Sequence, residues 1–254
     1  MLYILLFLLP LRISALSSIS SPSTCHRTFA LFKPDGFLSQ FVNNGQLKKR
    51  QRLVGELFDS TYPLPGLMTI GRLDEMSEGL LLVTTDGFLS HCVNCGGVEK
   101  EYYAQLDGAL TTEAVRDLER GVAISKQSGG GGTPFHTAPC RVVVLEDHPD
   151  LPPRRRNIRD ARHGPTTWVS ITIQEGKNRQ VRRMTAAVGF PTLRLVRVRV
   201  GSVRLLASAA DRSFQEKLRP GGIRELGEEE ISMLYDLSKI KNTNDGGFGV
   251  GEFA

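Results

Sequence analysis

The sequence predicts an α+β fold with a largely antiparallel sheet, because many short apolar strands are interrupted by few helical segments. Strands are indicated by the continuous apolar run at 80–83 and by the alternating run at 168–173. At 254 residues, with 40% hydrophobic and 23% charged residues, the chain fits one large globular domain or two small ones.

Apolar runs bounded by turn-forming residues predict the strands of this sheet. In chain order they lie at 28–32, 80–84, 101–106, 141–145, 168–173 and 193–200. In the last of them, Val196, Val198 and Val200 are predicted to face the core, and Arg197 and Arg199 to face outward.

Two helices are predicted between these strands. The first runs to residue 120, with Thr111 or Thr112 as its capping residue and Gly121 just past its end. The second, at 179–188, is short and basic, and Gly189 closes it. A turn is predicted at 86–87, and the glycine-rich stretch 128–133 indicates a flexible inserted loop.

Both ends of the chain are predicted to lie outside the folded domain. Residues 2–9 are wholly apolar but too few to span a bilayer, and the Ser-rich stretch after them lacks acidic residues. We therefore interpret 1–27 as a targeting-like or disordered segment, which favours a plastid or mitochondrion, and otherwise the cytoplasm. The catalytic domain is assigned to 28–226, and 227–254 to an acidic and low-complexity tail.

One segment supplies the positive charge of the chain. Between residues 151 and 204 there are 13 Lys and Arg against 2 Asp and Glu, whereas the rest of the chain has 19 basic and 25 acidic residues. A charged solvated face is the simpler explanation, but such clustering favours a surface that binds phosphates. The Arg-rich loop 154–162, with Arg197 and Arg199, is predicted to hold them.

The cysteines do not indicate a disulfide scaffold or a metal site. Cys92 and Cys95 have CxxC spacing without a second pair, and His91 and Cys140 offer no spacing that favours zinc. We predict free thiols and no metal. Phosphate-binding and dinucleotide-binding glycine motifs are also missing from the sequence.

Two segments about a hundred residues apart carry the candidate chemistry. Asp74 follows Gly-Arg-Leu in a turn before an apolar strand, and the second segment opens the basic helix. Taken alone, Asp74 is typical of a turn or a helix cap. A carboxylate acting as a nucleophile must stay ionised, and an Arg within reach favours the charged form. Arg182 or Arg183 is the predicted partner.

These segments resemble the RsuA-type family of ribosomal RNA pseudouridine synthases, and most closely its subgroup E, which acts on large-subunit rRNA. The resemblance covers roughly residues 28–207 in the motif order of the family. It is carried by the following stretches: 32–34, 38–41, 71–74, 79–81, 100–102, 158–159, 165–168, 175–184 and 187–191.

The resemblance implies a pseudouridine synthase catalytic fold and assigns roles to three residues. Asp74 matches the catalytic aspartate, Tyr102 the tyrosine that packs against the flipped uracil, and Arg182 the basic partner of the aspartate. Tyr103 and Arg183 remain alternatives to Tyr102 and Arg182. The predicted substrate-binding residues are Arg72, Leu73, Asn178, Arg179, Gln180, Arg183, Leu195 and Arg197.

The resemblance also implies the reaction and the partner. Uridine is isomerised to pseudouridine without redox change, so we expect no cofactor. The expected partner is ribosomal RNA, with the target base flipped out of its stack, and the mature protein is expected to be a monomer outside the membrane. The alternatives are a non-catalytic RNA-binding assembly factor and a synthase acting on another RNA.

Overall fold

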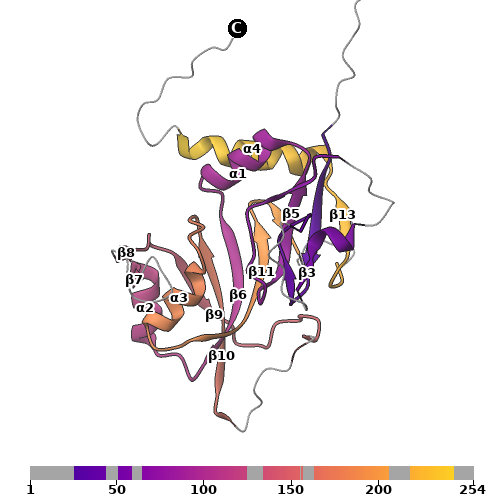
Figure 1. The fold of residues 1–254 in the computed structure, drawn as a ribbon. Helices are drawn as coiled ribbons and strands as arrows, with labels where there is room; N and C mark the ends of the chain where they lie inside the picture. The colour runs from indigo at the N-terminus through magenta and orange to yellow at the C-terminus, as the bar shows by residue number, and fades with distance from the viewer. Residues whose placement is uncertain are drawn as a thin grey trace, which may run out of the picture.

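A computed structural model describes residues 26–43, 51–58, 65–124, 134–154, 156, 163–205 and 218–242. Its centre is a nine-stranded sheet with the order β13-β1-β5-β11-β6-β10-β9, in which β12 pairs with β11 and β4 with β5 (Figure 1). These strands are β1 (Thr28–Lys33), β4 (Met68–Ile70), β5 (Glu78–Thr84), β6 (Lys100–Asp107), β9 (Arg141–Val144), β10 (Thr166–Ile173), β11 (Thr192–Val200), β12 (Val203–Arg204) and β13 (Ile223–Glu225).

The smaller elements complete the chain. Short strands form two further pairs: β2 (Phe37–Leu38) with β3 (Arg52–Leu53), and β7 (Ala123–Ile124) with β8 (Phe135–His136). The helices are the 3-10 turn η1 (Val54–Leu57), α1 (Gly87–Cys95), α2 (Thr112–Arg120), α3 (Gln180–Ala187) and α4 (Glu228–Asn242). In the main sheet β5 and β11 are parallel, and the other pairs are antiparallel. The predicted α+β class with a largely antiparallel sheet is confirmed.

The sheet separates two apolar cores, which explains the burial of its central strands. One core contains Leu118 of α2 and Met184 of α3, and the other contains Leu89 of α1 and Leu234 of α4. Alternate residues of β1 enter opposite cores, as expected for a strand covered on both faces. Figure 1 shows α1 and α4 together over one end of the sheet and α2 and α3 to its side.

The predicted outward orientation of Arg197 and Arg199 is wrong, because β11 lies in the middle of a sheet that is covered on both faces. Arg197 is 4% exposed, and its Nε donates to the Leu80 carbonyl at 2.7 Å. Arg199 donates to Glu101 at 2.8 Å and to Glu99 at 2.9 Å. Burial opposes the charge of Arg199, but these hydrogen bonds outweigh it and raise its pKa. Both side chains hold the sheet together.

Part of the predicted C-terminal tail, 227–254, forms the helix α4. Residues 228–242 form a helix that packs against α1, with Leu234 fully buried between them. The turn predicted at 86–87 is the start of α1, because the Asp86 carboxylate accepts the amides of Phe88 and Leu89. Asp86 also accepts the hydroxyl of Tyr235, which ties α4 to the end of α1.

Several predictions fall on residues that the structure does not describe. They concern 1–25 of the targeting-like segment, the glycine-rich loop, most of the basic loop 154–162, and 243–254 of the tail. Within the described ranges, no helix is long and apolar enough to cross a membrane. The cap at Thr111 is confirmed, since its hydroxyl accepts the Ala114 amide at 3.2 Å.

Candidate active site

Asp74 lies in a short loop, residues 71–77, between β4 and β5. We call this segment the Asp74 loop. The loop closes on itself through the Ser77 amide, which donates to the Asp74 carbonyl at 3.0 Å. Leu73 is buried beneath it, whereas the Asp74 side chain is 26% exposed. The backbone is thus fixed while the carboxylate faces outward from the core.

Side chains from distant parts of the chain bind the backbone of this loop. Ser39 donates from its hydroxyl to the Leu73 carbonyl at 2.9 Å and accepts the Leu73 amide at 3.1 Å. The Lys33 ammonium donates to the carbonyls of Glu75 at 3.3 Å and Ser77 at 2.7 Å. Because buried carbonyl groups need donors, these contacts define one conformation for the loop.

Lys33 is fully buried under the Asp74 loop. Burial lowers the pKa of its ammonium to about 8, although four nearby carboxylates, including Asp35 and Asp74, act in the opposite direction. Its third carbonyl contact is to Pro34 at 3.0 Å. Three N–H groups therefore meet three carbonyl oxygens, so the charged form is the one that fits the site.

Arg179 supplies the ion pair to Asp74. Its Nη1 lies 3.5 Å from Asp74 Oδ2, and its side chain is 43% exposed. Arg179 has φ +50° and ψ +32°, the left-handed conformation, at the position where α3 begins. That conformation costs a non-glycine residue roughly 1 kcal/mol, and such strain gathers at functional sites. It directs the guanidinium toward the Asp74 loop.

Arg182, the predicted direct partner, binds the loop backbone and not the Asp74 carboxylate. Its guanidinium donates to the carbonyls of Thr192 at 3.1 Å and Met76 at 3.3 Å, and to Ser77 Oγ at 3.5 Å. The expectation of a direct pair is corrected, because the turn at Arg179 brings that residue nearer. Burial and the charge of Arg179 lower the pKa of Arg182, and Asp74 raises it, so Arg182 still acts on Asp74 through space.

The remaining residues around the start of α3 organise the segment. Gln180 is buried and donates to Glu175 Oε2 at 2.6 Å, while its own oxygen accepts the Lys177 amide at 3.0 Å. Arg183, the alternative to Arg182, donates to Asn178 Oδ1 at 2.8 Å. Arg182 is therefore the one of the two that faces the Asp74 loop. Asn178 is exposed just before α3, and Arg72 is exposed within the Asp74 loop.

Tyr102 lies in the core on the same side of the sheet as part of the Asp74 loop. It shares one core cluster with Leu73 and Leu195, both predicted substrate-binding residues. Tyr103 packs against the other core, on the opposite face of the sheet. The structure therefore selects Tyr102 over Tyr103 as the tyrosine on the Leu73 and Leu195 face.

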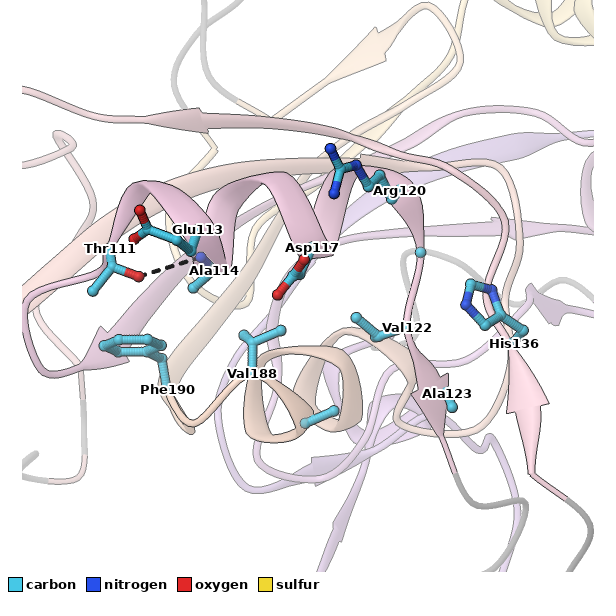
Figure 2. A pocket seen from close by; sticks show the side chains of 12 residues that line it. Thr111, Glu113, Ala114, Asp117, Arg120, Val122, Ala123, His136, Val188 and Phe190 are labelled. Carbon is cyan, nitrogen blue, oxygen red and sulfur yellow. Dashed lines mark hydrogen bonds between the residues drawn. The ribbon is translucent and has the colours of Figure 1, made fainter.

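A groove of about 690 Å³ lies elsewhere, between α2 and the C-terminal end of α3 (Figure 2). Asp117 and Arg120 of α2 and Val188 and Phe190 after α3 contribute to its lining, which contains none of the predicted site residues. In the described part of the chain, no group of three or more His, Cys, Asp or Glu is placed to hold a metal ion. We therefore locate the candidate site at the Asp74 loop.

Comparison with known proteins assigns the chain to a family. A family model described as RNA pseudouridylate synthase matches residues 27–187, more than half of the chain. The chain belongs to this family. It is 42% identical over 181 residues to "Ribosomal large subunit pseudouridine synthase E" of Xanthomonas axonopodis pv. citri (strain 306), covering 70% of this chain and 88% of that protein. A Vibrio vulnificus (strain CMCP6) protein of the same name is 36% identical over 212 residues, covering 82% and 79%.

A solved structure supports the same assignment. "Crystal structure of pseudouridylate synthase" superposes with a TM-score of 0.62 at 27% identity, covering 82% of this chain and 74% of that one. The resemblance seen in the motifs is confirmed, and the chain is an RNA pseudouridine synthase, an enzyme of the isomerase class.

For a pseudouridine synthase, the arrangement around Asp74 provides a partly exposed carboxylate on a fixed loop with two guanidinium groups nearby. Sequence reasoning found Asp74 and both arginines but missed the groups that fix the loop, namely Lys33, Ser39 and Arg154. Lys33 is the last residue of β1, directly before Pro34, and no local pattern distinguishes a buried lysine from an exposed one. What could have indicated the burial of Lys33 is its position at the end of an apolar run, which forms the wholly buried strand β1.

Proposed function

We propose that this enzyme isomerises a specific uridine in large-subunit ribosomal RNA, with Asp74 as the nucleophile. The observation that carries the proposal is the Asp74 loop. It presents a partly exposed carboxylate beside Arg179, and its backbone carbonyls accept hydrogen bonds from Lys33 and Ser39. The choice of RNA is supported by the relatives from Xanthomonas and Vibrio, whose names specify the ribosomal large subunit.

The reaction exchanges one bond of the base for another. Asp74 attacks C1′ and forms a bond to it as the N1–C1′ bond breaks; the detached uracil rotates, and C5 then bonds to C1′ as the bond to Asp74 breaks and the carboxylate is released. The proton on C5 is lost and N1 takes one up, so atoms and electrons balance without a redox partner. Arg179 forms an ion pair with Asp74 at 3.5 Å, and the charge of Arg182 also acts on Asp74, so both arginines place positive charge beside the attacking carboxylate.

The apolar residues at the base of the site would hold the uracil. The base leaves its stack at a cost of a few kcal/mol, and packing against an aromatic ring returns part of it. Tyr102 supplies that ring, and Leu73 and Leu195 keep water from the detached base. The role of the enzyme in ribosome biogenesis, and its delivery to a plastid or mitochondrion by residues 1–27, are parts of the same proposal.

The decisive experiment maps pseudouridine in organellar and cytosolic ribosomal RNA of cells that lack the gene. We expect one site in large-subunit RNA to be lost, and to be restored by wild type but not by Asp74→Asn, which preserves the shape of the side chain. Full activity of Asp74→Asn would show that the nucleophile is wrong. A site lost from transfer RNA or small-subunit RNA instead would show that the substrate is wrong.

A further inference from the structure

We propose that Arg154 is a positioning residue for Asp74, and that it joins the Asp74 loop to the arginine-rich segment 154–162. The inference rests on the proposed function, since it concerns the same site. It departs from the sequence-based expectation that this arginine contacts RNA phosphate. Arg154 is the first arginine of the segment, and the structure directs it into the protein.

The contacts of Arg154 are with the protein interior. Its side chain is 8% exposed, and its Nη2 donates to Asp35 Oδ1 at 3.1 Å and to the Met76 carbonyl at 3.2 Å. Its Nε lies 4.0 Å from Glu78 Oε1, at the start of β5. A guanidinium so enclosed has little surface left for a phosphate, whereas it reaches the backbone two residues beyond Asp74.

The segment that carries Arg154 is itself anchored. Arg194 of β11 donates from Nη2 to the Pro152 carbonyl at 2.8 Å and from Nε to Glu78 Oε2 at 2.7 Å. Both side chains of that second pair are less than 10% exposed. Residues 152–154 are therefore tied to β11 and to the first residue of β5, which fixes the position from which Arg154 reaches the loop.

Two arginines hold the Met76 carbonyl. Arg154 donates to it from one segment and Arg182 from α3. A tight turn whose carbonyl oxygen accepts from two separate elements has little freedom to shift. Removing Arg154 would leave the buried Asp35 carboxylate with one fewer cation, which is a strong driving force for local rearrangement.

Arg156 extends the connection toward solvent. Its Nε lies 3.3 Å from Asp35 Oδ2 and its Nη2 lies 3.7 Å from Glu75 Oε1, while its side chain is 47% exposed. The Asp35 carboxylate thus bridges a buried and a half-exposed arginine of the same segment. RNA bound at the half-exposed Arg156 side chain would act on the Asp74 loop through this bridge.

The test measures catalysis and RNA binding separately. The substrate is a large-subunit RNA fragment that carries the mapped uridine with tritium at C5, because the reaction releases that hydrogen. For Arg154→Met we expect the single-turnover rate at saturating RNA to fall about 100-fold, the loss that a displacement of about 1 Å can produce. The dissociation constant should stay within about threefold, and its salt dependence should not change.

Two further variants complete the design. Arg154→Lys keeps the charge but not the planar fork, so we expect its rate to lie between those of wild type and Arg154→Met. Arg141→Met removes an exposed arginine of β9 and serves as the matched control, with wild-type rate and affinity. An unchanged rate for Arg154→Met, with weaker binding and a smaller salt slope, would make Arg154 a phosphate ligand and overturn the proposal.

A second readout needs no substrate. Hydrogen exchange at the amides of residues 73–77 should be faster in Arg154→Met than in wild type, while exchange in β6 should be unchanged. Equal exchange in the loop would refute a positioning role even if the variant were less active. A wild-type enzyme that releases no tritium from ribosomal RNA would contradict the proposed function, and the exchange result would still decide the role of Arg154.

Discussion

Lys33 gives the sharpest prediction about how the Asp74 loop is held. Its ammonium is fully buried and donates to three carbonyls, two of them in the loop. The experiment changes the pH and compares wild type with Lys33→Met, which removes the titrating group but keeps an unbranched side chain. In the difference between the unfolding free energies of the two proteins, the contributions of other groups that titrate in the same range cancel.

The sign follows from proton binding. Burial lowers the pKa of Lys33 from 10.5 to about 8, so between these values the unfolded chain binds the proton and the folded protein does not. Stability therefore rises with pH in this window. Below the folded pKa the buried charge costs about 3 kcal/mol, at ~1.4 kcal/mol for each pKa unit. From pH 7 to pH 10, wild type should gain about 2.5 kcal/mol of unfolding free energy relative to Lys33→Met.

The assay is urea unfolding of both proteins at several pH values between 7 and 10. If the difference in unfolding free energy stays constant over this range, Lys33 keeps its ordinary pKa and the reasoning from burial is wrong. Activity should change in the opposite direction. A neutral amine has two N–H groups for three carbonyls, so the loop loses a contact and the single-turnover rate should fall above pH 8.

Three substitutions test other parts of the structure. Arg179→Gly should raise the urea midpoint, because glycine removes about 1 kcal/mol of left-handed strain, and should reduce the rate at least tenfold by removing the ion pair to Asp74. Arg199→Met should lower the unfolding free energy by about 3–5 kcal/mol, because the buried Glu101 loses its ion pair with Arg199, and it should not change the salt slope of RNA binding. A smaller slope would show that Arg199 contacts phosphate, as the sequence predicted. Leu234→Ala should lower the unfolding free energy, measured in urea, by about 2–5 kcal/mol. An unchanged unfolding free energy would show that α4 does not contribute to the stability of the folded domain.

The strands were predictable because each is an apolar run bounded by turn residues, and β1, β5, β6, β9, β10 and β11 all lie where these runs predict. What alternation does not reveal is whether a second layer covers the other face. Arg197 and Arg199 alternate with valines as exposed residues would, yet both are buried with backbone or carboxylate partners. The sequence pattern is the same for a long charged side chain that pairs with a residue far away in the chain and for one that points into water.

Helices α1 and α4 were not predicted from the sequence, for a different reason. Asp86-Gly87 reads equally well as a turn and as a helix start, and only the Asp86 carboxylate accepting two amides decides between them. Helix α4 has an acidic first turn and few core contacts, so its composition resembles that of a solvated tail. Its order comes from Leu234 and from the Tyr235 hydroxyl bound to Asp86, contacts between residues about 150 positions apart.

In the site, the sequence motifs identified the candidate reactive groups but not which arginine pairs with Asp74. The choice between Arg179 and Arg182 depends on the left-handed backbone at Arg179, and a regular helix phase does not predict that conformation. Arg154 could not be recognised as a buried residue, because it belongs to a run of arginines whose composition indicates an exposed loop. Its direction follows from contacts with the carboxylate of Asp35 and the carbonyl of Met76, both far away in sequence.

The carboxylates of Glu78, Glu101 and Asp74 differ in how closely an arginine binds them. Glu78 and Glu101 pair with arginines at 2.7 and 2.8 Å, and their side chains are 6% and 11% exposed. Asp74 pairs at 3.5 Å and is 26% exposed. A carboxylate bound closely by a buried guanidinium is stabilised as an anion but has its oxygens occupied, which opposes attack on a substrate. At Asp74 the contact with Arg179 is longer, at 3.5 Å, and more of the carboxylate is left accessible. The hydrogen bonds from Lys33, Ser39, Arg154 and Arg182 end on the loop backbone and hold the proposed nucleophile in place without contacting its carboxylate.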